Sequence, residues 1–245
     1  SRGGGDYDPS TYQLREHPAL IKLLSENPGW ILDGELYKHG KSLQQISGAA
    51  RMEKTAGGCD WLEYYIYDVM IPDAPFEDRL KCLNDIKDIL NLDFNPEREW
   101  EEDELRIQMV PQEIVTGNNK KEQIMNLHNQ YVAEGWEGCV ARDASKPYKY
   151  GGRGQEMVKF KMYQDAEFKI LGISEGLRPE DMCFVLATED GIEFKAKPMG
   201  SRELKEQYRD DLPNLVGKLA TVKYFYLSDE GTPLQPVLKA MRDYD

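Results

Sequence analysis

Charged side chains interrupt several segments of this sequence that are otherwise apolar. Asp33 and Glu35 stand two residues apart in W-I-L-D-G-E-L-Y, and Lys159 and Lys161 have the same spacing in V-K-F-K-M. Residues two apart in a strand point to one face of a sheet. A fifth charge, Glu137, opens the segment E-G-C-V-A-R. Carboxylates that hold a cation, together with lysines that offset phosphate charge, form the kind of site that binds a metal-bound polyphosphate.

Each of these features also has a plain structural explanation. An acid pair or a lysine pair at this spacing is typical of a solvated strand face, and a Glu-Gly pair is typical of a turn. Burying an ion without a partner is nevertheless costly, so a charge in an apolar strand needs a reason. The occurrence of all these features in one chain favours a phosphate-handling site over unrelated surface features.

Three tyrosines lie close together in the segment Y-Y-I-Y-D. Strand alternation predicts that Tyr65 and Tyr67 lie on one side of a sheet and that Tyr64 and Ile66 lie on the other. One side then packs in the core, and the other can offer a ring to a nucleobase. Core packing is the more common role, and the pattern alone leaves both roles open.

The loop over residues 146–154 combines basic residues with tyrosines. Residues 141–169 carry seven Lys or Arg against four acids, in a chain whose formal net charge is −13. Basic residues interleaved with aromatic rings suit a nucleic-acid backbone. Lys146, Lys149 and Arg153 are therefore candidate nucleic-acid contacts, although a solvated loop can have the same composition.

Composition argues against several classes of protein. The 44 acids against 31 basic residues do not fit a generally basic nucleic-acid coat protein or a membrane-surface binder, and 40% hydrophobic residues suffice for folded cores. No run approaches the roughly 20 apolar residues of a membrane span. The four cysteines form no C-x-x-C pair, and neither G-x-x-x-x-G-K-[ST] nor G-x-G-x-x-G occurs. We expect a cytoplasmic protein without a membrane partner.

Periodicity predicts an α+β fold in two domains. We expect helices over residues 17–26, 43–51, 76–92, 120–134 and 201–208. We expect strands over residues 30–37, 62–70, 106–115, 138–142, 157–162, 167–173, 182–188, 192–197 and 218–225. The change to short strands and turns after Gln164 predicts a first domain over residues 1–164 and a small β-barrel over residues 165–245.

The sequence resembles the ATP-dependent DNA ligases, particularly the short bacteriophage type, over essentially the whole chain. The resemblance lies in five ordered blocks: S-R-G-G-G, W-I-L-D-G-E-L-Y, Y-Y-I-Y-D-V-M, E-G-C-V-A-R-D, and V-K-F-K-M followed by D-A-E-F-K-I. It implies an ATP-grasp-like nucleotidyltransferase (adenylation) domain followed by an OB-fold barrel. It also implies an enzyme that seals 5′-phosphate/3′-hydroxyl nicks in duplex DNA through enzyme-AMP and DNA-AMP intermediates, in DNA replication and repair.

The resemblance implies roles for residues on the nucleotide side of such a site. ATP would be the AMP donor and Mg²⁺ the metal. Asp33 and Glu35 would organise the ribose and the catalytic metal, and Glu137 would bind the divalent cation. Tyr67, directly before Asp68, would stack on adenine. Arg2 would contact the ribose or the phosphate of the nick.

Further roles concern the phosphates. By the same resemblance, Lys159 and Lys161 would hold the α-phosphate and assist its transfer. Arg153 would meet the 5′-phosphate side of the nick. Arg242, in V-L-K-A-M-R-D, resembles the last motif of the family, which orients the leaving pyrophosphate. The partner would be nicked duplex DNA, bound by a monomer, in the host cytoplasm for a phage protein.

The sequence departs from the family pattern at the nucleophile. These enzymes attach AMP to the lysine of a K-x-D-G motif, and neither Asp33-Gly34 nor Asp190-Gly191 has a lysine two residues before its aspartate. The family places this block just upstream of S-R, so we expect an N-terminally incomplete domain. Two alternatives stay open: an RNA ligase or capping-type nucleotidyltransferase, and a catalytically incomplete DNA-binding remnant.

Overall fold

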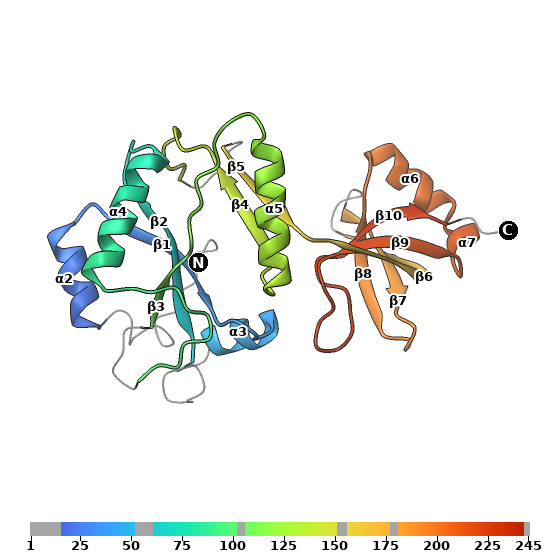
Figure 1. The fold of residues 1–245 in the computed structure, drawn as a ribbon. Coiled ribbons are helices and arrows are strands. Elements are labelled where there is room, and N and C mark those ends of the chain that lie inside the picture. The colour runs from blue at the N-terminus through green and yellow to red at the C-terminus, as the bar shows by residue number, and fades with distance from the viewer. Residues whose placement is uncertain (1–15, 52–60, 102–105, 151–155, 177–180, 243–245) are drawn as a thin grey trace. The chain divides into compact units, whose positions relative to one another are not determined.

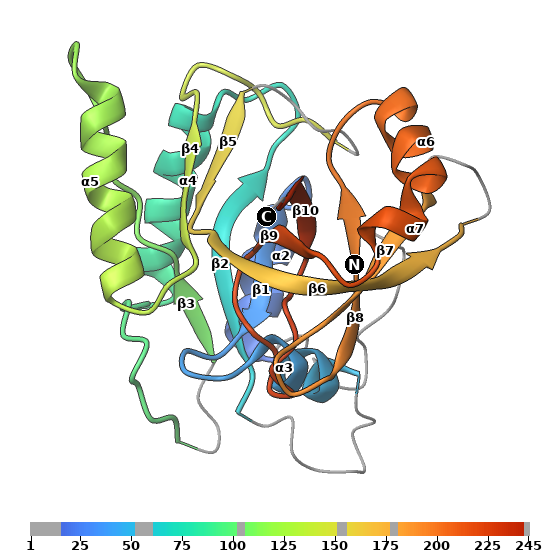
Figure 2. The same ribbon diagram turned by 90° about the vertical axis from the view of Figure 1, so that its right-hand side faces the viewer.

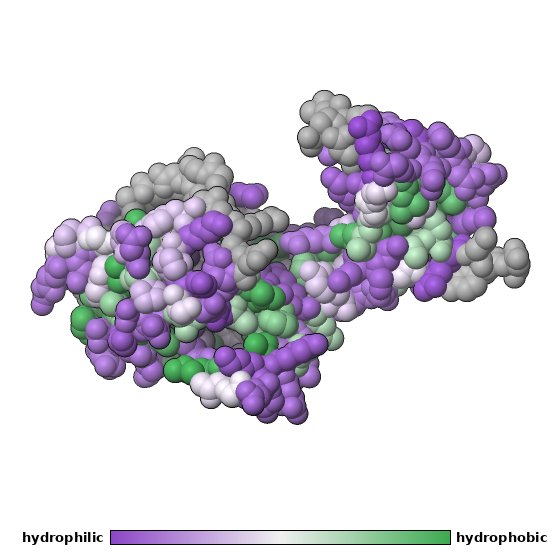
Figure 3. All heavy atoms as spheres, turned by 90° about the horizontal axis from the view of Figure 1, so that it is seen from above, coloured by the Kyte–Doolittle hydropathy of each residue, from purple (hydrophilic) through white to green (hydrophobic). Residues whose placement is uncertain are grey.

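The computed structural model describes residues 16–51, 61–101, 106–150, 156–176 and 181–242. The chain divides into two compact units, Ser1–Phe160 and Lys161–Asp245 (Figure 1). Hydrophilic residues dominate the face of each unit shown in Figure 3, in keeping with the net charge of −13. Among the described residues, none of the helices has the length and apolar character to cross a membrane.

The first unit contains a three-stranded sheet in the order β1-β2-β3. Strand β1 (Ile31–Tyr37) is antiparallel to β2 (Glu63–Met70), and β3 (Ile107–Met109) is parallel to β2. The strand expected over residues 106–115 is thus correct in place but too long. It ends at Met109, and Val110 still donates to the carbonyl of Ile66, whereas Pro111 has no N–H with which to extend the ladder.

Two helices bury their apolar stripes against one face of this sheet. Helices α2 (Pro18–Glu26) and α4 (Phe76–Ile89) share a core with the sheet that includes Leu23, Ile66 and Ile86. The three- and four-residue spacing of leucine and isoleucine in α4 produces its buried stripe. The short helix α3 (Leu43–Ala50) begins with a capping box at Ser42 and packs on a separate small apolar cluster.

A second, two-stranded sheet carries the segment that follows Glu137. Strand β4 (Gly138–Arg142) pairs with β5 (Met157–Lys161), and helix α5 (Lys120–Ala133) packs beside β4. Gly138 has φ +137°, and a Cβ there would lie 2.1 Å from the carbonyl oxygen of Phe160. Only glycine permits this approach of the two strands. The Glu-Gly pair is therefore not an ordinary turn.

The second unit is a closed five-stranded barrel in the order β10-β8-β7-β6-β9 (Figure 2). Its strands are β6 (Gln164–Ser174), β7 (Cys183–Ala187), β8 (Glu193–Pro198), β9 (Leu219–Tyr224) and β10 (Val237–Met241), with β8 parallel to β10. Helices α6 (Arg202–Asp210) and α7 (Leu212–Leu215) lie between β8 and β9 in the chain. This is OB-fold connectivity. The expected α+β fold with a C-terminal barrel is confirmed, although sequence periodicity did not assign β10.

The approach of β1 to β2 supplies a test of the packing in the first unit. A Cβ added to Gly34 would lie 2.5 Å from the carbonyl oxygen of Tyr65, whereas one added to Gly29 meets nothing within 4 Å. We expect Gly34→Ala to lower the free energy of unfolding by about 1–3 kcal/mol through overpacking. Gly29→Ala should change it by less than about 0.5 kcal/mol. Urea unfolding of both variants is the measurement, and equal stabilities would contradict the observed strand approach.

Candidate functional site

A β-bulge brings Tyr67 and Asp33 together. Along the β1-β2 ladder Asp33 pairs with Asp68, but the next residue, Gly34, pairs with Ile66. Tyr67 is therefore the extra residue of the bulge, a feature that often aims a side chain at a site. Its half-buried side chain lies beside Asp33 and Glu35, whose charges raise the pKa of its phenol after the larger effect of burial. Simple strand alternation does not anticipate this arrangement.

A second phenol reaches the same carboxylate. The hydroxyl of Tyr148 donates to Oδ2 of Asp33 at 2.7 Å. The pKa of Tyr148 is raised mainly by burial and then by its hydrogen bond to Asp33, and the pKa of Tyr67 is raised mainly by burial and then by the charge of Asp33. Both phenols therefore stay neutral at physiological pH, because burial disfavours a phenolate and the neighbouring carboxylate would also repel it.

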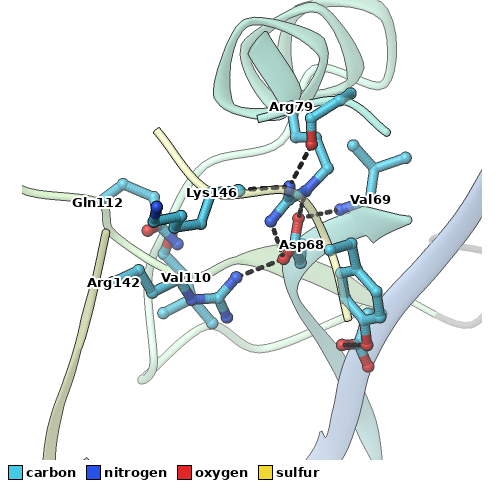
Figure 4. A network of polar contacts seen from close by, with 10 residues as sticks. Asp68, Val69, Arg79, Val110, Gln112, Arg142 and Lys146 are labelled. Atoms are coloured by element: carbon cyan, nitrogen blue, oxygen red, sulfur yellow. Dashed lines mark hydrogen bonds and ion pairs between the residues drawn. The ribbon is translucent and has the colours of Figure 1, made fainter. Parts of the chain in front are cut away.

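A buried ion cluster lies next to the bulge. The Asp68 side chain is 1% exposed, and Arg79 donates to it twice, from Nε at 2.8 Å and from Nη2 at 3.0 Å (Figure 4). Arg142, at the end of β4, forms a second ion pair with the same carboxylate. The Arg142 guanidinium also lies 5.6 Å from the centroid of the Tyr67 ring. The cluster thus connects α4, β2 and β4 and holds a cation against Tyr67.

The loop after β4 is fastened to the start of α4. The backbone N–H of Phe76 donates to the carbonyl of Lys146 at 3.0 Å, and the N–H of Glu77 donates to the carbonyl of Ala144 at 2.9 Å. Nη1 of Arg79 reaches the Lys146 carbonyl at 3.4 Å. The side chains of Lys146 and Lys149 remain exposed on this fastened loop, as a role in binding phosphate would require.

The remaining predicted residues differ in their exposure and in their place in the fold. Glu137, directly before β4, and Lys159, within β5, are exposed. Lys161 is half-buried, and its Nζ lies 4.5 Å from the centroid of the Phe225 ring. Arg242 follows β10 in the barrel, where its Nε pairs with Oε1 of Glu167 at 2.9 Å. Arg2 and Arg153 lie outside the described residues.

Sequence reasoning missed the charges that are in fact buried. Glu63 and Asp68 both interrupt the β2 segment, and they are 0% and 1% exposed. Asp33 is half-buried, and Glu35 and Glu137 are exposed. The signal was available, because β2 is the most apolar strand that carries acids. The role of Tyr148 had no sequence signal, since its partner is 115 residues away.

Comparison with known sequences relates this site to one family. A family model described as the ATP dependent DNA ligase domain matches residues 1–161. The DNA ligase of African swine fever virus is 28% identical over 221 residues, in several isolates, covering 83% of this chain and 49% of the viral protein. The chain therefore spans about half the length of the curated relatives it matches.

Solved structures show the same fold. A structure of a Lig E DNA ligase, described as binding DNA with a minimal scaffold, is 21% identical with a TM-score of 0.67, over 86% of this chain and 76% of that one. A structure named Pmar-Lig_Pre is 17% identical with a TM-score of 0.72, over 93% of this chain and 55% of that one. Identities this low bear on the fold alone.

The Asp68 cluster yields a stability test within one helix. Replacing Arg79 by Met should destabilise the first unit by about 3–5 kcal/mol, because a buried carboxylate loses its bidentate partner. Lys81→Met removes an exposed ion pair with Asp78 from the same helix and should have little effect. Denaturant unfolding compares the two variants. Similar decreases in the free energy of unfolding for the two variants would mean that the buried ion pair contributes no more to stability than the exposed one.

Proposed function

The chain belongs to the ATP-dependent DNA ligase family, and on this premise we propose that it joins 5′-phosphate and 3′-hydroxyl ends at nicks in duplex DNA. ATP is the AMP donor of the complete reaction, which passes through enzyme-AMP and DNA-AMP, and the protein acts as a monomer. The observation that supports this most directly is the half-buried Tyr67 side chain, which lies beside Asp33 and is backed by the Arg142 guanidinium. This is an arrangement suited to an adenine nucleoside.

The nucleotide side of the proposed site follows from these contacts. The Tyr67 ring stacks on adenine, and the cation of Arg142 strengthens an aromatic stack by polarising the ring. The carboxylates of Asp33 and Glu35 accept hydrogen bonds from the ribose hydroxyls. Arg2 contacts the ribose or the nick phosphate. The neutral phenol of Tyr148 donates to Asp33 and leaves its negative charge available to these hydroxyls.

The phosphate side uses one exposed and one half-buried lysine of β5. The ammonium groups of Lys159 and Lys161 hold the α-phosphate and neutralise the charge that develops during transfer. Arg242 orients the leaving pyrophosphate. The described residues contain no group of three His, Cys, Asp or Glu side chains that could hold a metal. Mg²⁺ commonly takes only one or two carboxylates together with phosphate oxygens, so Glu137 and Asp33 fit as its ligands. When bound, Mg²⁺ would supply further neutralisation of phosphate charge.

Nicked DNA is bound by the loop that follows β4. Lys146 and Lys149 place two exposed ammonium groups on a backbone that α4 fastens in position. Arg153 meets the 5′-phosphate. Because the protein as a whole carries a net charge of −13, DNA binding is confined to such local basic surfaces.

A nick that already carries AMP tests the proposed function without the adenylation step. The 245 residues contain no K-x-D-G lysine, so the assay supplies AMP on the 5′-phosphate. Wild-type protein with Mg²⁺ should seal this nick, and Glu137→Ala or Lys159→Ala should abolish sealing. Glu26→Ala and Lys22→Ala, exposed positions on α2, serve as matched controls that should seal normally. Normal sealing by the Glu137 or Lys159 variant would overturn these assignments, and sealing only of RNA nicks would favour an RNA ligase.

The dependence of DNA affinity on salt tests the role of the loop. Each lysine-phosphate contact releases about one counterion, so the slope of log affinity against log salt should fall by about 0.9 when Lys149 is replaced by Ala. Lys22→Ala should leave the slope unchanged. Fluorescence anisotropy at several salt concentrations gives both slopes. An unchanged slope for Lys149→Ala would remove this lysine from the DNA interface.

A further inference from the structure

The hydrogen bond from Tyr148 to Asp33 joins two parts of the first unit that the proposed function uses separately. Tyr148 belongs to the loop that carries Lys146 and Lys149, and Asp33 belongs to β1 in the nucleotide site. The donor and acceptor atoms are 2.7 Å apart, across 115 positions of sequence. The only role given to Tyr148 above is to donate this hydrogen bond within the nucleotide site.

The position of Tyr148 is set from several sides. Its neighbour Pro147 forms an isolated β-bridge with Pro75, just before α4. The Arg79 guanidinium lies 5.5 Å from the centroid of the Tyr148 ring, and Tyr150 packs against that ring edge-on with centroids 5.2 Å apart. A ring held in this way has little freedom, so its hydroxyl defines where the carboxylate of Asp33 must lie.

The position of the Asp33 carboxylate in turn affects Tyr67, the ring that is proposed to stack on adenine. Tyr67 lies beside the same carboxylate. Burial and then the charge of Asp33 raise the pKa of Tyr67, and burial and then the hydrogen bond to Asp33 raise the pKa of Tyr148. A displacement of the loop therefore changes the geometry of Asp33, and through Asp33 that of Tyr67. Hydrogen bonds to a charged acceptor are stronger than neutral ones, which makes this connection effective.

We propose that Tyr148 is a positioning residue that couples the DNA-contacting loop to the nucleotide site through its hydrogen bond to Asp33. DNA phosphates that fix the loop also fix the carboxylate that receives the ribose. By thermodynamic linkage, bound AMP then strengthens DNA binding by the same factor. The inference rests on the proposed function, because it assigns DNA to the loop and the ribose to Asp33.

The test measures AMP affinity with and without nicked DNA that ends in a 3′-deoxynucleotide, so that no joining occurs. Coupling energies in proteins commonly correspond to factors of about 5–150, and we expect nicked DNA to tighten AMP binding of the wild-type protein by at least about fivefold. Tyr148→Phe keeps the ring and removes the donor, and the enhancement should fall to within about twofold. Tyr150→Phe is the matched control and should retain the full enhancement.

A second variant separates positioning from folding. Asp33→Asn removes the charged acceptor and should lose the enhancement as well, and Tyr148→Phe added to it should cause no further loss, because both changes break one connection. A purely structural role would lower the thermal midpoint without changing the ratio of the two AMP affinities. That ratio is therefore the informative quantity.

The outcomes are distinct. An enhancement that survives in Tyr148→Phe, losses that add in the double variant, or a wild-type protein without enhancement would each overturn the coupling. The proposed function fails separately, if the wild-type protein leaves a pre-adenylated nick unsealed. Coupled binding without sealing would keep the role of Tyr148 and reject the ligase activity.

Discussion

The buried carboxylate of Asp68 is the constraint on which the candidate site depends. Removing an ion from water is costly unless fixed partners replace its hydration. The carboxylate of Asp68 forms ion pairs with both Arg79 and Arg142. These three residues come from β2, α4 and β4, so a single unfavourable group forces three segments to meet. Removing either arginine would leave an unbalanced charge in the interior. The arrangement of β2, α4 and β4 around Asp68 is therefore more specific than apolar packing alone would make it.

The side chains of the candidate site take their positions from this ion cluster. Tyr67 precedes Asp68 in the chain, and the bulge next to the pinned aspartate aims its ring at Asp33. Arg142 brings the end of β4 to the same place, and the following loop is hydrogen-bonded to the start of α4. The loop can then deliver Tyr148 to Asp33. Each contact adjoins the previous one, so the site extends outward from a structural ion pair.

Sequence patterns predicted the elements better than the partners. The strand around Tyr65 and the stripe of α4 follow from local periodicity, which a chain carries within ten or so residues. The strand at Ile107 was extended too far because the effect of Pro111 on the ladder was not weighed. Asp68 was not singled out although it interrupts an apolar strand. Which arginine would neutralise it depends on tertiary contacts, and no local pattern records these.

The burial of the carboxylates separates structural from chemical roles in a way that residue type does not. Glu63 is fully buried and accepts hydrogen bonds from Trp100 at 2.9 Å and from Gln108 at 2.8 Å, with Lys38 paired to it. A carboxylate saturated by fixed donors has no capacity left for a ligand that comes and goes. Exposed acids such as Glu137 keep exchangeable water, which a cation or a ribose can displace. Half-buried Asp33 stands between these limits, because Tyr148 donates to it while part of the residue stays exposed to solvent.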